Sequence, residues 1–197
     1  MLYAKIKDGS IEQYPSYPNV DHPNVSFPEN WAGGVINGDE YVVVNGSEFP
    51  SVNIGWTVVE GQPVNIDGSW FTTYTTVLLS NEELKRIVTN IRMRKENGGV
   101  KVGDYVYDTS RESQTKYIAV ALDILRTNSP SLSIDWKLPD GTFVTLNALQ
   151  MNEVIDAVKN HVQNCFQKEK YYFDLIDTSD VSVLESTDFS ADWPSNS

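Results

Sequence analysis

The sequence has 197 residues, a formal net charge of −12 and 40% hydrophobic residues, which suits one domain of ordinary size or two small ones. It shows no apolar run long enough to span a bilayer and no basic segment followed by an apolar stretch, so neither a membrane span nor a secretory signal is expected. A single cysteine, Cys165, excludes an intrachain disulfide, and we expect folding in a reducing cytosol.

The charge is unevenly distributed along the chain. Residues 1–79 carry 2 basic and 9 acidic side chains, residues 80–170 carry 13 and 12, and residues 171–197 carry none and 6. Phosphate groups are bound by clustered Lys and Arg, so the two acidic ends argue against nucleic acid and against an anionic membrane surface as partners.

The pattern of residues 1–79 predicts short strands joined by tight turns. Asp8-Gly9 and Asp67-Gly68 are strong hairpin signals, because both central residues of a type I′ turn need positive φ. A short β-branched strand is expected at residues 40–44. Residues 15–40 are rich in turn formers and are predicted to form an irregular loop; loops of this length are often functional or bind a partner.

Residues 80–176 are predicted to form three helices separated by two hairpins. Ser80 and Glu83 form a capping box that begins the first helix. The hairpins are expected to turn at Gly103-Asp104 and at residues 139–141. A strand–turn–strand–cap–helix pattern therefore occurs twice. Because neither copy buries its own apolar face, we expect the two copies to pack together.

The apolar faces of the second and third helices are predicted from the spacing of their residues. On the second helix, which is expected to end within residues 128–130, the face comprises Tyr117, Ile118, Ala121, Leu122 and Leu125. The third helix is expected to start at Asn147, with Gln150 completing its cap. Its apolar stripe comprises Met151, Val154, Ile155, Val158, Val162, Cys165 and Phe166.

The segment YDTSRESQ, which begins at Tyr107, concentrates hydroxyl and charged side chains and has two interpretations. As an active site, it would use Ser110 or Ser113 as the nucleophile and one of the two acidic neighbours as the base. No histidine is near in the sequence, however, and no Gly-x-Ser-x-Gly elbow is present. A helix cap requires only a residue of the kind found at positions 108–110, so we interpret the segment as a cap.

Two residue pairs at i, i+4 spacing lack the partners that their chemistry would need. His161 and Cys165 would supply two zinc ligands, but a zinc site needs three or four, and the only other histidine, His22, is far away in the sequence. Asp108 and Glu112 would repel each other on a helix, and nothing indicates a sugar-sized cleft around them. We therefore predict no enzyme activity, no metal and no cofactor.

Residues 177–197 are acidic, Ser-rich and aperiodic, a composition typical of a disordered tail. Phe189 and Trp193 are unusual in such a tail, and an acidic tail becomes ordered only when the rest of the chain or a neighbouring subunit holds it. We expect a partner-binding arm, so that truncation after residue 176 would weaken partner binding and leave residues 80–170 folded.

Two stretches of the chain resemble a known family. GGVKVGDYVYDTSRESQ and DWKLPDGTFVTLNALQMNEVIDAVKNHVQNCF resemble a domain of unknown function that recurs in tail proteins of tailed bacteriophages. The matching residues are Gly98, Gly99, Val100, Thr109, Arg111, Ser113, Gln114, Trp136, Lys137, Asp140, Gly141, Phe143, Val144 and Leu146. The opening, YPSYPNVDHPNVSFPENW, is similar to the opening of phage tail proteins, so the resemblance covers residues 1–28 and about 86–166.

The resemblance implies a structural component of a phage tail, made in the host cytoplasm and located in the virion. It would be a tail-fibre or baseplate-associated protein that contacts other tail proteins as a homo- or hetero-oligomer, without catalysis. The alternative is a tail-fibre assembly chaperone, and a polysaccharide-degrading tip enzyme is a remote third. Partner contacts are then expected at Tyr17, Trp31, Phe189 and Trp193, because Tyr and Trp anchor interfaces well.

Together these patterns predict an α+β fold in three segments. Residues 1–79 would be a β-rich, aromatic-rich attachment segment, residues 80–176 an α+β domain of the phage-tail type, and residues 177–197 an acidic arm. The sequence predicts no nucleic-acid partner and no membrane insertion.

Overall fold

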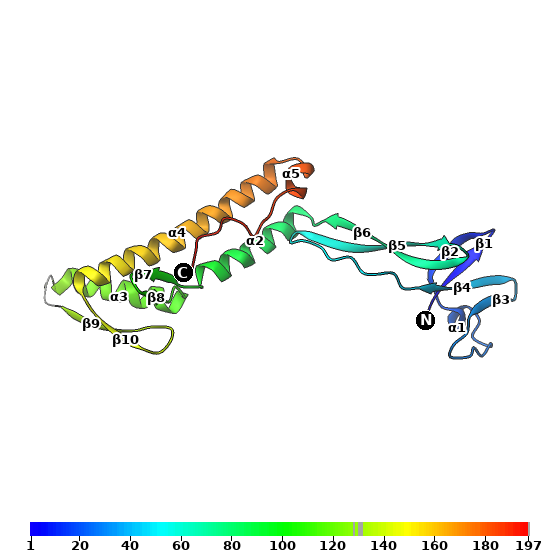
Figure 1. Ribbon diagram of the computed structural model, residues 1–197, viewed down its shortest axis with the longest axis horizontal. Helices are drawn as coiled ribbons and strands as arrows, with labels where there is room; N and C mark the ends of the chain where they lie inside the picture. The colour runs from blue at the N-terminus through cyan, green and yellow to red at the C-terminus, as the bar shows by residue number, and fades with distance from the viewer. Residues whose placement is uncertain (128, 130–131, 197) are drawn as a thin grey trace. The chain divides into compact units, whose positions relative to one another are not determined.

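The computed structural model describes residues 1–127, 129 and 132–196 and confirms the α+β class. The chain divides into two compact units, Met1–Leu78 and Leu79–Ser197, which we call the N-terminal unit and the C-terminal unit. Strands and one short helix make up the first unit, and helices with two small hairpins make up the second (Figure 1). The predicted end of the second helix, at residues 128–130, falls largely outside the described residues.

The N-terminal unit is built on one sheet. Its strands are β1 (Leu2–Lys7), β2 (Ser10–Ser16), β3 (Gly33–Ile36), β4 (Asp39–Asn45), β5 (Trp56–Ile66) and β6 (Ser69–Leu78). They follow the order β2-β1-β4-β6-β5, and β3 pairs with β4. Neighbouring strands are antiparallel except β4 and β6. These two strands are parallel, with Val44 opposite Trp70 and Asn45 opposite Phe71.

Both predicted hairpin turns of the N-terminal unit are confirmed. Asp8 and Gly9 join β1 to β2 with φ of 52° and 75°, and Asp67 and Gly68 join β5 to β6 with φ of 50° and 82°. Two successive residues with positive φ match the right-handed twist of the flanking strands, which is why Asp-Gly is favoured at these positions.

The predicted irregular loop at residues 15–40 is more ordered than expected. It contains the short helix α1 (Pro18–Asp21) and strand β3, which joins β4 through Asn37 and Gly38 with φ of 53° and 97°. Asn-Gly is the same kind of turn signal as Asp-Gly, so the sequence did carry a sign of this hairpin. Strands β3 and β4 approach so closely at Gly33 that a Cβ there would lie 2.4 Å from the carbonyl oxygen of Tyr41.

The core of the N-terminal unit is small. Ala4, Ile6 and Val44 form its buried cluster, with partly buried apolar side chains packed around them. Tyr41 is buried as well, and its hydroxyl donates a hydrogen bond of 2.9 Å to Asp21 Oδ2. The buried Tyr41 side chain therefore connects β4 to helix α1 through a hydrogen bond.

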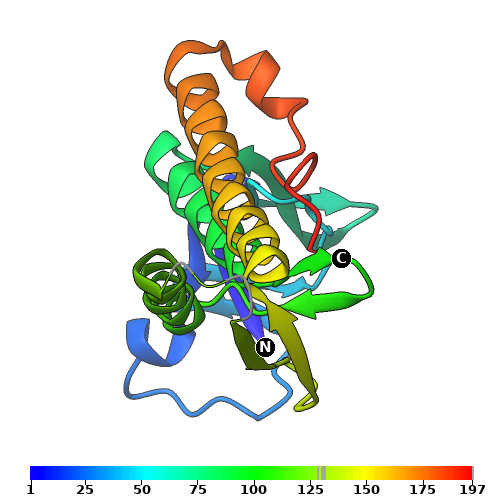
Figure 2. The same cartoon turned by 90° about the vertical axis from the view of Figure 1, so that its left-hand side faces the viewer.

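The C-terminal unit is built around a pair of helices. Its elements are α2 (Asn81–Glu96), β7 (Val100–Val102), β8 (Tyr105–Tyr107), α3 (Arg111–Thr127), β9 (Ser133–Lys137), β10 (Phe143–Asn147), α4 (Ala148–Thr178) and α5 (Val181–Glu185). Helices α2 and α4 lie side by side (Figure 2). They run antiparallel, because Asn81 Nδ2 donates to the Ile176 carbonyl at one end while His161 Nε2 contacts the Lys95 carbonyl at the other.

Local sequence signals account for where these helices begin. The predicted capping boxes are confirmed, Ser80 with Glu83 at α2 and Asn147 with Gln150 at α4. In each box the N-cap side chain accepts from a backbone N–H of the first turn, and the later side chain accepts from the N-cap N–H. None of the helices in the described part of the chain is both long enough and apolar enough to cross a membrane.

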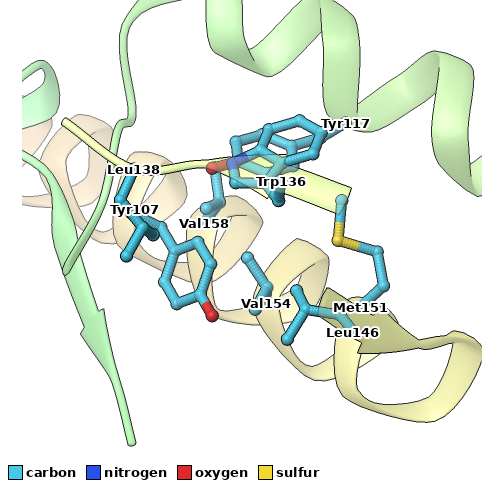
Figure 3. Packing of buried hydrophobic residues seen from close by; sticks show 8 residues of the cluster. All are labelled: Tyr107, Tyr117, Trp136, Leu138, Leu146, Met151, Val154 and Val158. Atoms are coloured by element: carbon cyan, nitrogen blue, oxygen red, sulfur yellow. The ribbon is translucent and has the colours of Figure 1, made fainter. Parts of the chain in front are cut away.

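Both hairpins and both following helices share one core, which confirms that the two hairpin–helix copies pack together. The rings of Tyr117 and Trp136 stack at its centre, with centroids 4.5 Å apart and an interplanar angle of 18°. Figure 3 shows the cluster, which comprises Tyr107, Tyr117, Trp136, Leu138, Leu146, Met151, Val154 and Val158. The stack joins α3 to β9, so it sets the rotation of α3 about its own axis.

The predicted apolar face of α3 is wrong for three of its five residues. Tyr117 is buried, but Ile118, Leu122 and Leu125 are 63%, 61% and 76% exposed. Val120 and Ile124 pack against the core in their place. They follow Tyr117 at i+3 and i+7, so the stacked ring directs their row inward and turns the second apolar row outward.

The predicted acidic arm is corrected to an internal part of the C-terminal unit. Helix α4 extends to Thr178, and the chain after α5 runs back along α4 and α2 towards β7 (Figure 1). We call residues 179–196 the strap. Composition predicted disorder because it averages over the segment, whereas two aromatic rings spaced four residues apart bury enough surface to order it.

The strap is held in place by aromatic packing and by partly buried hydrogen bonds. The ring centroids of Phe189 and Trp193 lie 5.5 Å and 5.7 Å from that of Tyr172 on α4. The Tyr172 hydroxyl donates to the carbonyls of Asp188 and Ala191 at 3.0 Å and 2.8 Å. Further along, Asn196 Nδ2 donates to the carbonyls of Lys95 and Gly99. The strap therefore closes over the α2–α4 pair.

We predict that Phe189→Ala lowers the free energy of unfolding of the C-terminal unit by about 3–5 kcal/mol, because a fully buried ring is lost. Urea denaturation of the full chain, followed by tryptophan fluorescence, measures the change. The control is Val183→Ala, since Val183 is 42% exposed and should change stability by less than about 1 kcal/mol. Equal effects of the two substitutions would restore the arm hypothesis.

Candidate functional site

The segment from Asp108 to Gln114 is where the sequence suggested either catalysis or a helix cap. Ser110 Oγ accepts from the backbone N–H of Ser113 at 3.4 Å, and the Gln114 N–H bonds to the Ser110 carbonyl at 2.9 Å. Ser110 is therefore the N-cap of α3, which confirms the capping interpretation. The hydroxyls of Ser110 and Ser113 both donate to Asp108 Oδ2 at 2.6 Å.

The electrostatics of Asp108 are those of a cap acceptor. Partial burial raises the pKa of its carboxyl, but hydrogen bonds from Ser110 and Ser113 outweigh burial and bring the pKa below its usual value. The carboxylate therefore accepts hydrogen bonds from both hydroxyls in its ionised form. These serines hold the start of α3 in place.

Two further side chains of the segment connect it to neighbouring elements. Thr109 is fully buried, and its hydroxyl accepts from the Gly99 N–H at 2.9 Å and donates to the Glu96 carbonyl. Gln114 Nε2 donates to the Thr109 carbonyl at 2.9 Å. The end of α2, the start of β7 and the start of α3 are thus joined at one point, which we call the threonine junction.

His161 and Cys165 lie together on α4 but form a packing contact. Cys165 Sγ is 3.8 Å from His161 Nε2, and that nitrogen lies 2.9 Å from the Lys95 carbonyl. Burial, and then the nearby charge of Glu96, raise the pKa of the Cys165 thiol to about 11, which keeps it protonated at neutral pH. Across the described residues no group of three or more metal-ligating side chains comes together.

The four side chains predicted to contact a partner have different environments. Tyr17, at the start of α1, is 53% exposed and available at the surface of the N-terminal unit. Trp31 is half-buried and packs on Phe27 and Tyr3, with ring centroids 4.9 Å and 5.4 Å away. Phe189 and Trp193 are buried in the C-terminal unit, so the structure gives them an internal role in place of the predicted partner contact.

The most distinctive surface feature of the C-terminal unit is a groove between α3 and α4 that sequence reasoning missed. It has a volume of about 390 Å³. Its apolar lining comes from Ile118, Ala121 and Leu122 of α3 and from Ile155, Val158 and Val162 of α4. The sequence did contain a signal for it, because α3 carries two rows of apolar residues at helical spacing and only one of them is needed for the core.

We predict that Thr109→Val destabilises the C-terminal unit by about 2–4 kcal/mol, because the Gly99 N–H and the Glu96 carbonyl both lose a buried partner. Thermal unfolding monitored by circular dichroism measures the effect. Thr115→Val is the matched control, since Thr115 is exposed on the same helix and bonds only to Arg111 O. If both variants have the same melting temperature, the threonine junction contributes no more to stability than an exposed threonine does.

Comparison with known proteins gives one match. The sequence model of a family described as a domain of unknown function, DUF4376, matches residues 80–191. No match was found among curated proteins or among solved structures. The matched range contains α2 to α5, both small hairpins, the threonine junction and the part of the strap that carries Phe189. Because this range is more than half of the chain, the protein belongs to the DUF4376 family.

Proposed function

We propose that this protein is a structural component of a bacteriophage tail, a fibre- or baseplate-associated subunit that acts through protein–protein contacts without catalysis. The resemblance of its sequence to phage tail proteins supports the proposal. One observation carries it further: Thr109, Ser113 and Gln114, which belong to the resemblance, are engaged in hydrogen bonds that build the C-terminal unit. Residues that hold a scaffold in shape suit a protein that works by presenting surfaces.

Arg111 is the residue of the same stretch that the scaffold does not use. It is exposed and is the first residue of α3, and its side chain makes no hydrogen bond or ion pair with any other described residue. A positive charge at the positive end of a helix dipole is unfavourable for stability. A contact with an acidic group of a neighbouring tail protein would give Arg111 a role that its own unit does not supply.

We predict that Arg111→Glu leaves the melting temperature unchanged or slightly higher, because it removes the unfavourable dipole interaction, and that it reduces incorporation of the chain into particles. Quantitative mass spectrometry of particles assembled with each variant measures incorporation. The control is Lys101→Glu, which reverses the charge of another exposed residue in the same unit. Equal incorporation of both variants would remove Arg111 from the proposed contact.

A tail-fibre assembly chaperone is the second candidate. The groove between α3 and α4 favours it. A chaperone needs an exposed apolar surface of its own, because that surface covers the apolar surface of its client until the client assembles. The two candidates differ in whether the protein remains with the mature particle.

Quantitative mass spectrometry on density-purified particles from infected cells tests the proposal. We expect the chain at a stoichiometry that scales with a known tail protein. Abundance in the lysate without any in the particle would favour the chaperone. A gene located away from tail genes, with no chain in particles or assembly intermediates, would contradict both.

A further inference from the structure

Gly98 lies just after the end of α2, and its own backbone does not require a glycine. Its φ is outside the positive range that only glycine adopts readily, whereas Gly99 next to it has a φ of 87°. A side chain at position 98 would nevertheless have no room. A Cβ there would lie 2.5 Å from Nδ2, 2.6 Å from Cγ and 3.0 Å from Oδ1 of Asn196, and these are its three nearest atoms. The glycine is therefore explained by a residue of the strap.

The side chain of Asn196 fills the space beside Gly98 and bonds to the backbone around it. Its Nδ2 donates to the Lys95 carbonyl at 2.6 Å and to the Gly99 carbonyl at 3.1 Å. An amide nitrogen carries two hydrogens, so the two carbonyls use both of them. Lys95 belongs to the last turn of α2, where carbonyls have no partner within the helix. Asn196 therefore acts as a cap for this end of α2.

His161 completes this seat from the side of α4. Its Nε2 lies 2.9 Å from the Lys95 carbonyl and 3.4 Å from Asn196 Nδ2. Because a carbonyl oxygen only accepts, Nε2 carries the ring proton, and both side chains donate to the same oxygen. His161 is 4% exposed, so the seat has a buried wall. We call Asn196, together with Gly98, Gly99, Lys95 and His161, the latch.

The latch is the second of two attachments of the strap, the first being the packing of Phe189 and Trp193 on Tyr172. Asp192 lies between the two attachments and does little to hold the strap. Its carboxylate is 87% exposed and 3.9 Å from the Lys168 ammonium, and exposed ion pairs add little stability. Its φ of 54° is a conformation that residues other than glycine rarely adopt. The closed position of this stretch therefore depends on the attachments on either side of Asp192.

We propose that the latch is a conformational switch. While Asn196 is seated, residues 188–196 are closed over Tyr172, and when Asn196 leaves its seat they open as one unit and make Phe189 and Trp193 accessible. The core around Tyr117 and Trp136 contains no residue of the strap, so it stays packed in the open state. The switch does not depend on the tail proposal, because it follows from the C-terminal unit alone.

Cleavage of the native full chain by chymotrypsin after Phe189 measures how often the strap is open, because this fully buried ring is reached only then. We expect Asn196→Ala and Gly98→Ala each to raise the initial rate about tenfold, since each removes both hydrogen bonds of the Asn196 amide. Cleavage after Phe143, which is 68% exposed in the same unit, should not change. Mass spectrometry follows both cuts, and circular dichroism melts verify that each variant folds.

The double variant tests why position 98 is a glycine. Asn196→Ala removes the three atoms that a Cβ at position 98 would meet. Adding Gly98→Ala to Asn196→Ala should therefore leave cleavage after Phe189 unchanged, although the same substitution raises it in the wild-type background. The matched control is Gly46→Ala. Gly46 also has a φ outside the positive range, and a Cβ there would meet nothing within 4 Å.

Three results would overturn the switch. Unchanged cleavage after Phe189 in folded Asn196→Ala would mean that Asn196 detaches without opening the strap. An equal effect of Gly98→Ala with and without Asn196 would show that the glycine serves the backbone at the end of α2. An equal rise in cleavage after Phe189 and after Phe143 would show that the whole unit opens. None of these results bears on whether the chain is found in phage particles.

Discussion

The C-terminal unit depends on the buried hydroxyl of Thr109. By bonding to Glu96 and Gly99 it joins the end of one helix to the start of a hairpin, and the serine cap that follows starts α3 from that point. The ring of Tyr117 then stacks on Trp136 and sets the rotation of α3. The apolar row of α3 that faces solvent, and the groove beside it, are therefore consequences of how the threonine junction places α3.

Features that depend on neighbours in the sequence were predictable. The Asp8-Gly9 turn and the capping boxes at Ser80 and Asn147 need only residues within three positions, so their patterns identify them directly. The rotation of α3 was not predictable, because its two apolar rows have the same spacing and a ring from a later strand decides between them. Periodicity shows that a helix has an apolar face, and tertiary packing decides which face is inside.

The candidate site was harder to predict than the fold. Aromatic residues were expected to contact a partner, yet Phe189 is fully buried and Tyr17 is exposed, although both occur in stretches rich in polar and turn-forming residues. An aromatic ring has the same apolar area whether it fills a core or anchors an interface, so residue type alone does not distinguish these roles. The surfaces that now stand out, the outward apolar row of α3 and Arg111, are identified by what they lack, a partner within their own unit.

The hydrogen bond from Asn196 to the carbonyl of Lys95 spans 101 positions of the chain. Contacts between such distant residues form only after the intervening chain is largely ordered, because closing a long loop has a high entropic cost. We therefore expect the hairpins and the α2–α4 pair to assemble before the strap docks on them. By the same reasoning we expect the strap to open before the rest of the C-terminal unit, and its backbone amides to exchange with solvent sooner than those of the α2–α4 pair.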